Sequence, residues 1–122
     1  MKRIALLSVP DPRFPSPSDP GYENNRVDYR NLIEGAVRVP LDPQKGADIA
    51  EMRKGIRILD ALDQARDDVL ALEDADWEFL KTKVEKMPWN VTDRRFIQFY
   101  DDIMGATDAV RDPTRADGIA AT

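Results

Sequence analysis

The chain has 122 residues, of which 42% are apolar and 34% charged, and this is the size of one domain. It contains no cysteine and no histidine, which excludes disulfides, thiolate or imidazole metal sites and histidine-based acid–base catalysis. The net charge of −5 divides into ten basic and eight acidic residues over 1–57 and eight basic and fifteen acidic residues over 58–122. Because no basic stripe occurs, nucleic-acid binding is disfavoured.

A short apolar run opens the chain. Residues 4–7 follow Lys2 and Arg3, and Pro10 comes soon after. A secretory signal needs an apolar region of about 7–15 residues, and a membrane span needs about 20. We therefore interpret residues 3–9 as a short strand and expect a cytoplasmic protein that does not enter a membrane.

Residues 10–25 contain five of the nine prolines. Proline removes a backbone donor and keeps its predecessor extended, so we predict an extended arm. Phe14 and Tyr22 are its two aromatic residues and are the candidate anchors for a partner protein. The alternative is a connector that lies on its own domain or a solvated tether.

Asp28 is a candidate N-cap for the first helix, whose apolar residues have helical spacing: Tyr29, Leu32, Ile33, Ala36 and Val37. The alternative ends this helix at Gly35 and makes residues 36–39 a short strand. Pro40 and Pro43 then predict an extended turn.

The clearest helix is predicted over residues 49–65. Asp48 and Glu51 have the spacing of a capping box, in which each side chain accepts a hydrogen bond from the backbone of the other residue. The residues predicted to face inward are Ile49, Met52, Ile56, Leu59 and Leu62, and those on the other face are Arg53, Lys54, Arg57 and Asp60.

Three further elements follow. Residues 69–72 form an apolar run that predicts a strand, with residues 3–9 or 37–41 as its partner. A third helix is predicted before Pro88, with Trp77, Leu80, Val84 and Met87 facing inward. Thr92 is predicted to cap a fourth helix that ends at Gly105, with Phe96, Ile97, Tyr100, Ile103 and Met104 facing inward.

Together these elements predict a mainly α fold, a small domain of three to four helices with one or two short β-strands. Residues 1–25 are expected to form a short strand plus the extended proline-rich arm, and residues 26–105 the helical core. Residues 106–122 have no apolar period and are expected to be a flexible tail.

The stretch from residue 60 to residue 76 is strongly acidic. We interpret Asp63, Asp67 and Asp68 as a candidate face for a basic partner. Helix caps with a solvated surface are the alternative, and a calcium or magnesium site is a weaker one because the glycine of the calcium loop is missing.

The sequence contains no phosphate-binding glycine loop and no nucleophile beside a base. We therefore predict no catalytic residue, no cofactor and no metal, and a protein that is not an enzyme.

The strand and the proline arm precede YRNLIEGAVRVPLDPQKGADIAEMRKGIRILDALDQA, then LEDADWEFLKTKVEKMPW and FIQFYDDI. Over residues 29–104 this pattern resembles the small accessory and morphogenesis proteins of tailed bacteriophages, and its size and acidity are similar to those of tail assembly chaperones. The resemblance implies a non-enzymatic assembly protein that binds other viral proteins or itself in the host cytoplasm. It assigns no individual residue.

Two alternatives stay open. One is a structural component of the virion, such as a head–tail connector, stopper or decoration protein. The other is an acidic inhibitor of a host enzyme or defence complex. In each case the partners are proteins, and the opposite charges of the two halves favour a homo-oligomer.

Overall fold

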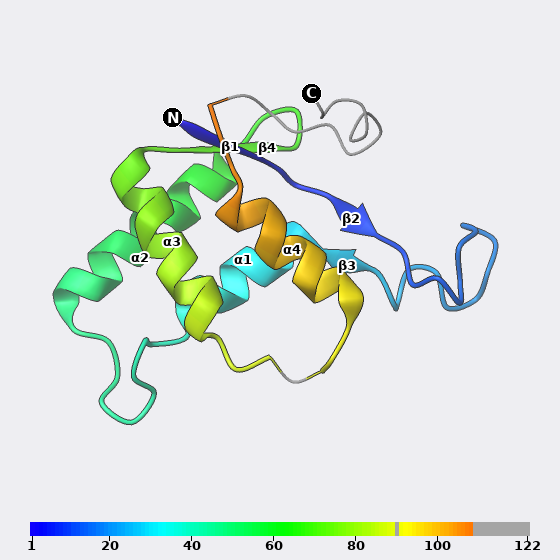
Figure 1. Ribbon diagram of the computed structural model, residues 1–122, viewed down its shortest axis with the longest axis horizontal. Coiled ribbons are helices and arrows are strands. Elements are labelled where there is room, and N and C mark those ends of the chain that lie inside the picture. The colour runs from blue at the N-terminus through cyan, green and yellow to red at the C-terminus, as the bar shows by residue number, and fades with distance from the viewer. Residues whose placement is uncertain (90, 109–122) are drawn as a thin grey trace.

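A computed structural model describes residues 1–89 and 91–108 (Figure 1). The chain order is β1 (Lys2–Ala5), β2 (Ser8–Val9), β3 (Val27–Asp28), α1 (Tyr29–Arg38), α2 (Ile49–Asp63), β4 (Val69–Leu72), α3 (Asp74–Lys86) and α4 (Arg94–Met104). The fold is a small domain dominated by helices, as predicted, but its described residues hold four short strands where one or two were expected.

The strands form two small antiparallel sheets. β1 pairs with β4, with Lys2 opposite Leu72 and Ala5 opposite Val69. β2 pairs with β3, with Val9 opposite Val27. The N-terminal strand is therefore the partner of β4. The alternative strand over residues 36–39 is wrong, because α1 continues to Arg38.

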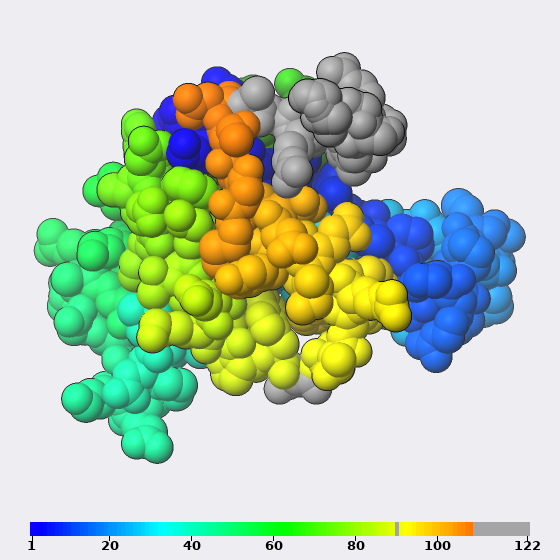
Figure 2. Space-filling model, in the orientation of Figure 1, coloured from blue at the N-terminus to red at the C-terminus, as the bar shows by residue number. Residues whose placement is uncertain are grey.

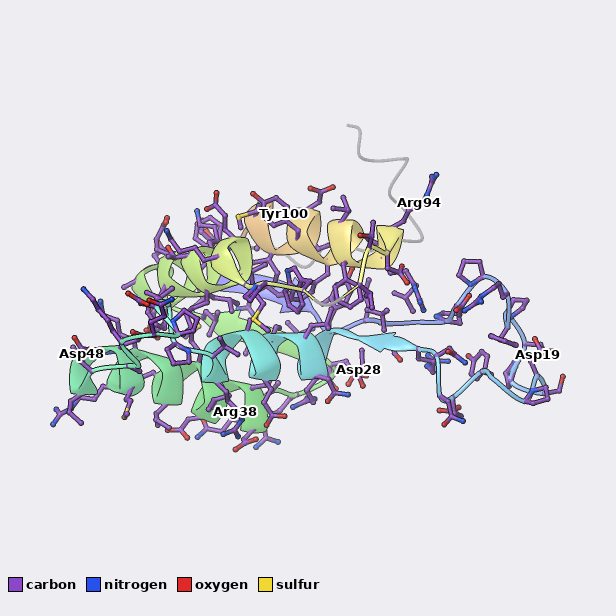
Figure 3. All side chains as sticks on the ribbon, turned by 90° about the horizontal axis from the view of Figure 1, so that it is seen from below. Asp19, Asp28, Arg38, Asp48, Arg94 and Tyr100 are labelled. Atoms are coloured by element: carbon purple, nitrogen blue, oxygen red, sulfur yellow. The ribbon has the colours of Figure 1, made fainter. Side chains whose placement is uncertain are left out.

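The helices are arranged in two layers around one core. In the view of Figure 3, α3 and α4 lie on one side and α1 and α2 on the other. The side chain of Asp28 caps α1, and the buried residues Tyr29, Ile33, Ala36 and Val37 confirm its predicted inward face. The core also includes Ile4 and Leu6 from the N-terminal segment, so β1 and the helices belong to one packed unit.

α2 forms where it was predicted, but its predicted inward face is only partly correct: Leu62 is buried and Leu59 packs against the core, as predicted. Gly55, Ile58 and Leu62 are its buried residues, whereas Ile49, Met52 and Ile56 are among the exposed large hydrophobics. The reason is the close approach of α1, since a Cβ atom on Gly55 would lie 3.2 Å from Cγ1 of Val37. Helical spacing alone does not reveal this contact.

α3 buries Leu80 and Val84 as predicted, and α4 differs from its prediction in two ways. Asp93, and not Thr92, is the N-cap. Phe99 is fully buried while Ile97 is 64% exposed, because the ring of Phe99 packs edge-on against Tyr29, with centroids 5.0 Å apart. Ile103 is buried and Gly105 follows the helix, both as predicted.

Residues 106 and 107, which were predicted to belong to a flexible tail, contact the rest of the domain. Ala106 is 7% exposed, and the carbonyl of Thr107 accepts a hydrogen bond of 2.7 Å from the backbone N–H of Arg3. The rest of that predicted tail, residues 109–122, lies outside the described residues. Within the described ranges, no helix has the length and apolar composition needed to span a membrane.

Candidate functional site

Residues 10–25 connect β2 to β3 and stand out from the body of the molecule, as Figures 1 and 2 show. We name this segment the projecting loop. Its chain turns repeatedly, with backbone hydrogen bonds from Phe14 to Asp11 (2.8 Å), Asp19 to Ser16 (2.9 Å) and Tyr22 to Asp19 (3.1 Å). The segment is thus a series of turns and is not continuously extended. That it binds a partner stays a prediction.

The two predicted anchors of the projecting loop are partly buried in the loop itself. The ring of Phe14 lies over Gly21, where an added Cβ atom would be 3.0 Å from the ring carbons. The guanidinium of Arg26 lies 4.5 Å from the centroid of the Tyr22 ring, and that of Arg13 lies 5.5 Å from the Phe14 centroid. Each aromatic ring is thereby held by a neighbour while part of its surface remains open.

Arg95, near the start of α4, holds both ends of the projecting loop. Its Nη1 donates hydrogen bonds to the carbonyls of Val9 (3.2 Å) and Asn25 (2.7 Å). Its other nitrogens make a two-point contact with Asp93, at 3.0 and 2.7 Å. The side chain of Arg95 is 12% exposed, so this anchor is largely withdrawn from solvent.

Asp11 completes the base of the loop. Its carboxylate accepts hydrogen bonds from the side chain and the backbone of Arg13 and lies 3.8 Å from Arg95. The side-chain hydrogen bonds of Arg13, followed by the backbone hydrogen bond, lower the pKa of Asp11 to about 2. The side-chain bonds of Arg95 likewise lower the pKa of Asp93. Both carboxylates are therefore ionised at neutral pH.

The acidic candidates lie elsewhere. Asp63 is the last residue of α2, and Asp67 and Asp68 form the turn that leads into β4. Their φ angles are 57° and 56°, and Val69 donates a backbone hydrogen bond of 3.1 Å to Arg66, which is the geometry of a type I′ turn. All three carboxylates are exposed. In the part of the chain that the structure describes, no group of three or more acidic side chains could hold a metal ion.

Lys83 is a functional candidate that the sequence does not reveal, because a lysine near the end of a helix is usually exposed and its partner Glu51 is 32 positions away. It is 3% exposed, and its ammonium donates hydrogen bonds to the carbonyl of Val39 and to Glu51 Oε2. Glu51 also accepts a bond of 2.8 Å from the backbone N–H of Leu41. The predicted capping box is thus half correct. The side chain of Asp48 accepts a hydrogen bond from the backbone N–H of Glu51, but the carboxylate of Glu51 accepts its hydrogen bonds from Lys83 and Leu41.

Arg95 was missed for a similar reason. Its loop contacts, Val9 and Asn25, are 86 and 70 positions away in sequence, so no local pattern marks it. Figure 3 shows the loop residue Asp19 and the α2 cap Asp48 at opposite ends of the molecule. The projecting loop and α2 are therefore separate candidate surfaces.

Comparisons of this chain with protein-family models, with curated proteins and with solved structures found no match.

Proposed function

We propose that the protein is a non-enzymatic assembly protein of the tailed-phage type, which acts in the host cytoplasm by binding another viral protein through the projecting loop. The observation that carries the proposal is the fixation of both loop ends by the side chain of Arg95, which is 12% exposed. The sequence resemblance over residues 29–104 supports the phage assembly context.

A loop held at its base suits binding because part of the ordering cost is met before the partner arrives. The loop and the residue that follows it offer aromatic and arginine side chains, which are enriched at protein interfaces and carry much of their binding energy. The two pairs are Phe14 with Arg13, and Tyr22 with Arg26, which lies between the loop and β3.

A site-specific cross-linker tests this assignment. A photoreactive phenylalanine analogue at Tyr22 is expected to cross-link to the product of a neighbouring morphogenesis gene when the two are co-expressed. The same analogue at Gln44, an exposed position in the turn before α2, is the control and is expected to give no such product. Equal cross-linking from both positions, or none from Tyr22, would overturn the proposal.

The affinity of variants for the cross-linked partner protein then shows which loop residue contributes most to binding. Tyr22→Ala is expected to weaken binding at least about tenfold, as the loss of an interface anchor does, without a change in melting temperature. Gln44→Ala is the matched control.

Mass spectrometry of mature phage particles distinguishes an assembly protein from a structural component of the virion. We expect the protein to be absent from the particles, and its presence in stoichiometric amounts would favour the virion component instead.

A further inference from the structure

Arg26, the residue directly after the projecting loop, is held by three contacts. Its Nε donates a hydrogen bond of 2.8 Å to Ser8 Oγ, and its Nη2 donates one of 2.9 Å to the carbonyl of Ser8. The guanidinium also lies 4.5 Å from the centroid of the Tyr22 ring. Because these contacts come from β2 and from the loop, the guanidinium is bound to both and has a defined position.

The charge of Arg26 has no counter-charge among the described residues. Two other arginines at the projecting loop each pair with a carboxylate. Arg13 lies 2.9 Å from Asp11, and Arg95 lies 2.7 Å from Asp93. Arg26 forms no ion pair in residues 1–89 and 91–108, although it is as firmly placed as the other two.

The carboxylates nearest to Arg26 in the sequence do not supply this charge. The side chain of Asp28 caps α1, and that of Asp19 accepts a hydrogen bond from the loop backbone. Glu23 is exposed and makes no ion pair within the described ranges. The positive charge of Arg26 is therefore available to a partner.

Two polar groups of this pair of side chains reach solvent. In the described part of the chain, neither Nη1 of Arg26 nor the hydroxyl of Tyr22 makes a hydrogen bond. No buried side-chain nitrogen or oxygen there lacks a hydrogen-bond partner, so both groups must be accessible. They lie beside one aromatic ring, where a single binding partner can contact them together.

A carboxylate is the group that matches this arrangement. Ser8 occupies Nε and one proton of Nη2, which leaves the protons of Nη1 free to donate. Hydrogen bonds from a guanidinium to a carboxylate are charge-assisted and about twice as strong as neutral ones. The hydroxyl of Tyr22 can donate to the same group.

A chain of phosphates matches the site poorly. Residues 14–25 include Asp19 and Glu23 but no lysine or arginine. Nucleic acid would bring several phosphates close to these two carboxylates, and the affinity of proteins for it depends on many cations. A single carboxylate on the surface of a folded protein can reach the guanidinium without this repulsion.

We propose that Arg26 determines the specificity of the projecting loop by pairing with an aspartate or glutamate of the partner protein, while the Tyr22 ring packs beside that carboxylate. The inference rests on the proposed function, since it names the chemistry of the partner that the loop binds. The bonds to Ser8 and the Tyr22 ring already restrict the guanidinium, which reduces the entropy lost when the pair forms.

Affinity measurements with the protein that cross-links to position 22 test this inference. Arg26→Gln is expected to weaken binding at least about tenfold, as the loss of an interface arginine does. Arg53→Gln removes the same charge at an exposed position of α2 and is expected to leave the affinity unchanged. The difference between wild type and Arg26→Gln is expected to shrink as the salt concentration rises. No loss in Arg26→Gln, or an equal loss in both variants, would overturn the proposal.

A charge exchange separates the partner contact from the structural role of Arg26 in holding Ser8. Mass spectrometry of the cross-linked peptide identifies the partner's carboxylates near position 22. Arg26→Glu is expected to weaken binding at least as much as Arg26→Gln, and a partner variant with arginine in place of one of these carboxylates is expected to recover most of the loss. A merely structural role predicts no recovery with any of them.

The outcomes distinguish this inference from the proposed function. A protein that cross-links to position 22 but binds equally well to wild type and Arg26→Gln would leave the binding role of the loop intact and exclude the carboxylate pair. The absence of any cross-linked protein would overturn the proposed function and this inference with it. Cross-linking to nucleic acid in place of protein would show that the site takes a phosphate.

Discussion

The ammonium of Lys83 lies 2.9 Å from the carboxylate of Glu51, where α3 meets the start of α2. The Lys83 side chain is 2% exposed and that of Glu51 is 16% exposed. Burial alone would raise the pKa of Glu51, but hydrogen bonds from the Leu41 backbone and from Lys83 outweigh it, so the pKa of Glu51 is lowered. This pair fixes the turn after α1 against two helices.

Removing the charge of Glu51 is expected to lower the free energy of unfolding more than removing the charge of Lys83. Glu51→Gln leaves a buried ammonium without its counter-charge and is expected to lower the free energy of unfolding by about 3–5 kcal/mol. Lys83→Met removes the buried charge and keeps the side-chain length, while Glu51 retains the Leu41 hydrogen bond and some solvent, so a smaller loss is expected. Urea denaturation of both variants measures the difference, and equal losses would contradict the asymmetry.

The base of the projecting loop is expected to be sensitive to acid. The pKa of Asp11 falls from 3.8 to about 2 on folding, so its contribution is present above pH 4 and is lost as the pH falls toward 2. Carboxyl chemical shifts of Asp11 measured against pH are expected to show this low titration. The melting temperature of Asp11→Asn is expected to fall less steeply between pH 4 and pH 2 than that of the wild type.

Substitutions at Asp67 and Asp68 can distinguish a structural role of these residues in the turn from an electrostatic role in binding. Both residues have positive φ, a conformation that Asn and Gly adopt more easily. Asp67→Asn combined with Asp68→Gly is expected to stabilise the fold by about 1 kcal/mol, measured by chemical denaturation.

The same double variant also tests the acidic face. It removes two of the three predicted partner-binding charges, so unchanged binding to a captured partner would show that these aspartates serve the turn. Slower association of the variant than of the wild type, with a difference that shrinks as the salt concentration rises, would favour a steering role.

Two glycines are expected to respond to alanine in opposite ways. In Gly21→Ala the new Cβ would lie 2.9 Å from Nδ2 of Asn25 and 3.0 Å from the Phe14 ring, so the projecting loop is expected to rearrange. Amide chemical shifts should change within residues 10–25 and little elsewhere.

Gly35→Ala is the control for that variant. No atom lies within 4 Å of the added Cβ, and Gly35 is inside α1, so a gain of about 0.5–1 kcal/mol is expected from helix propensity. A loss of stability in Gly35→Ala would mean that the outer face of α1 is more crowded than the structure indicates.

The sequence by itself determined the elements whose signals are local. The Asp28 cap and the apolar spacing after it predict α1 and its buried face correctly, because a cap and a helical period involve residues only two to four positions apart. For the same reason the positions of α2, β4 and α3 and the end of α4 at Gly105 were predictable.

Tertiary structure alone decided which of two apolar faces turns inward and which charges become buried. α2 carries Ile49, Met52 and Ile56 on one side and Ile58 and Leu62 on another, and the close contact of Gly55 with Val37 selects the second. Lys83 meets a carboxylate 32 positions away, and Arg95 meets a carbonyl 86 positions away. Such contacts depend on how whole elements pack, and burial of a charge is tolerated only where that packing brings its partner.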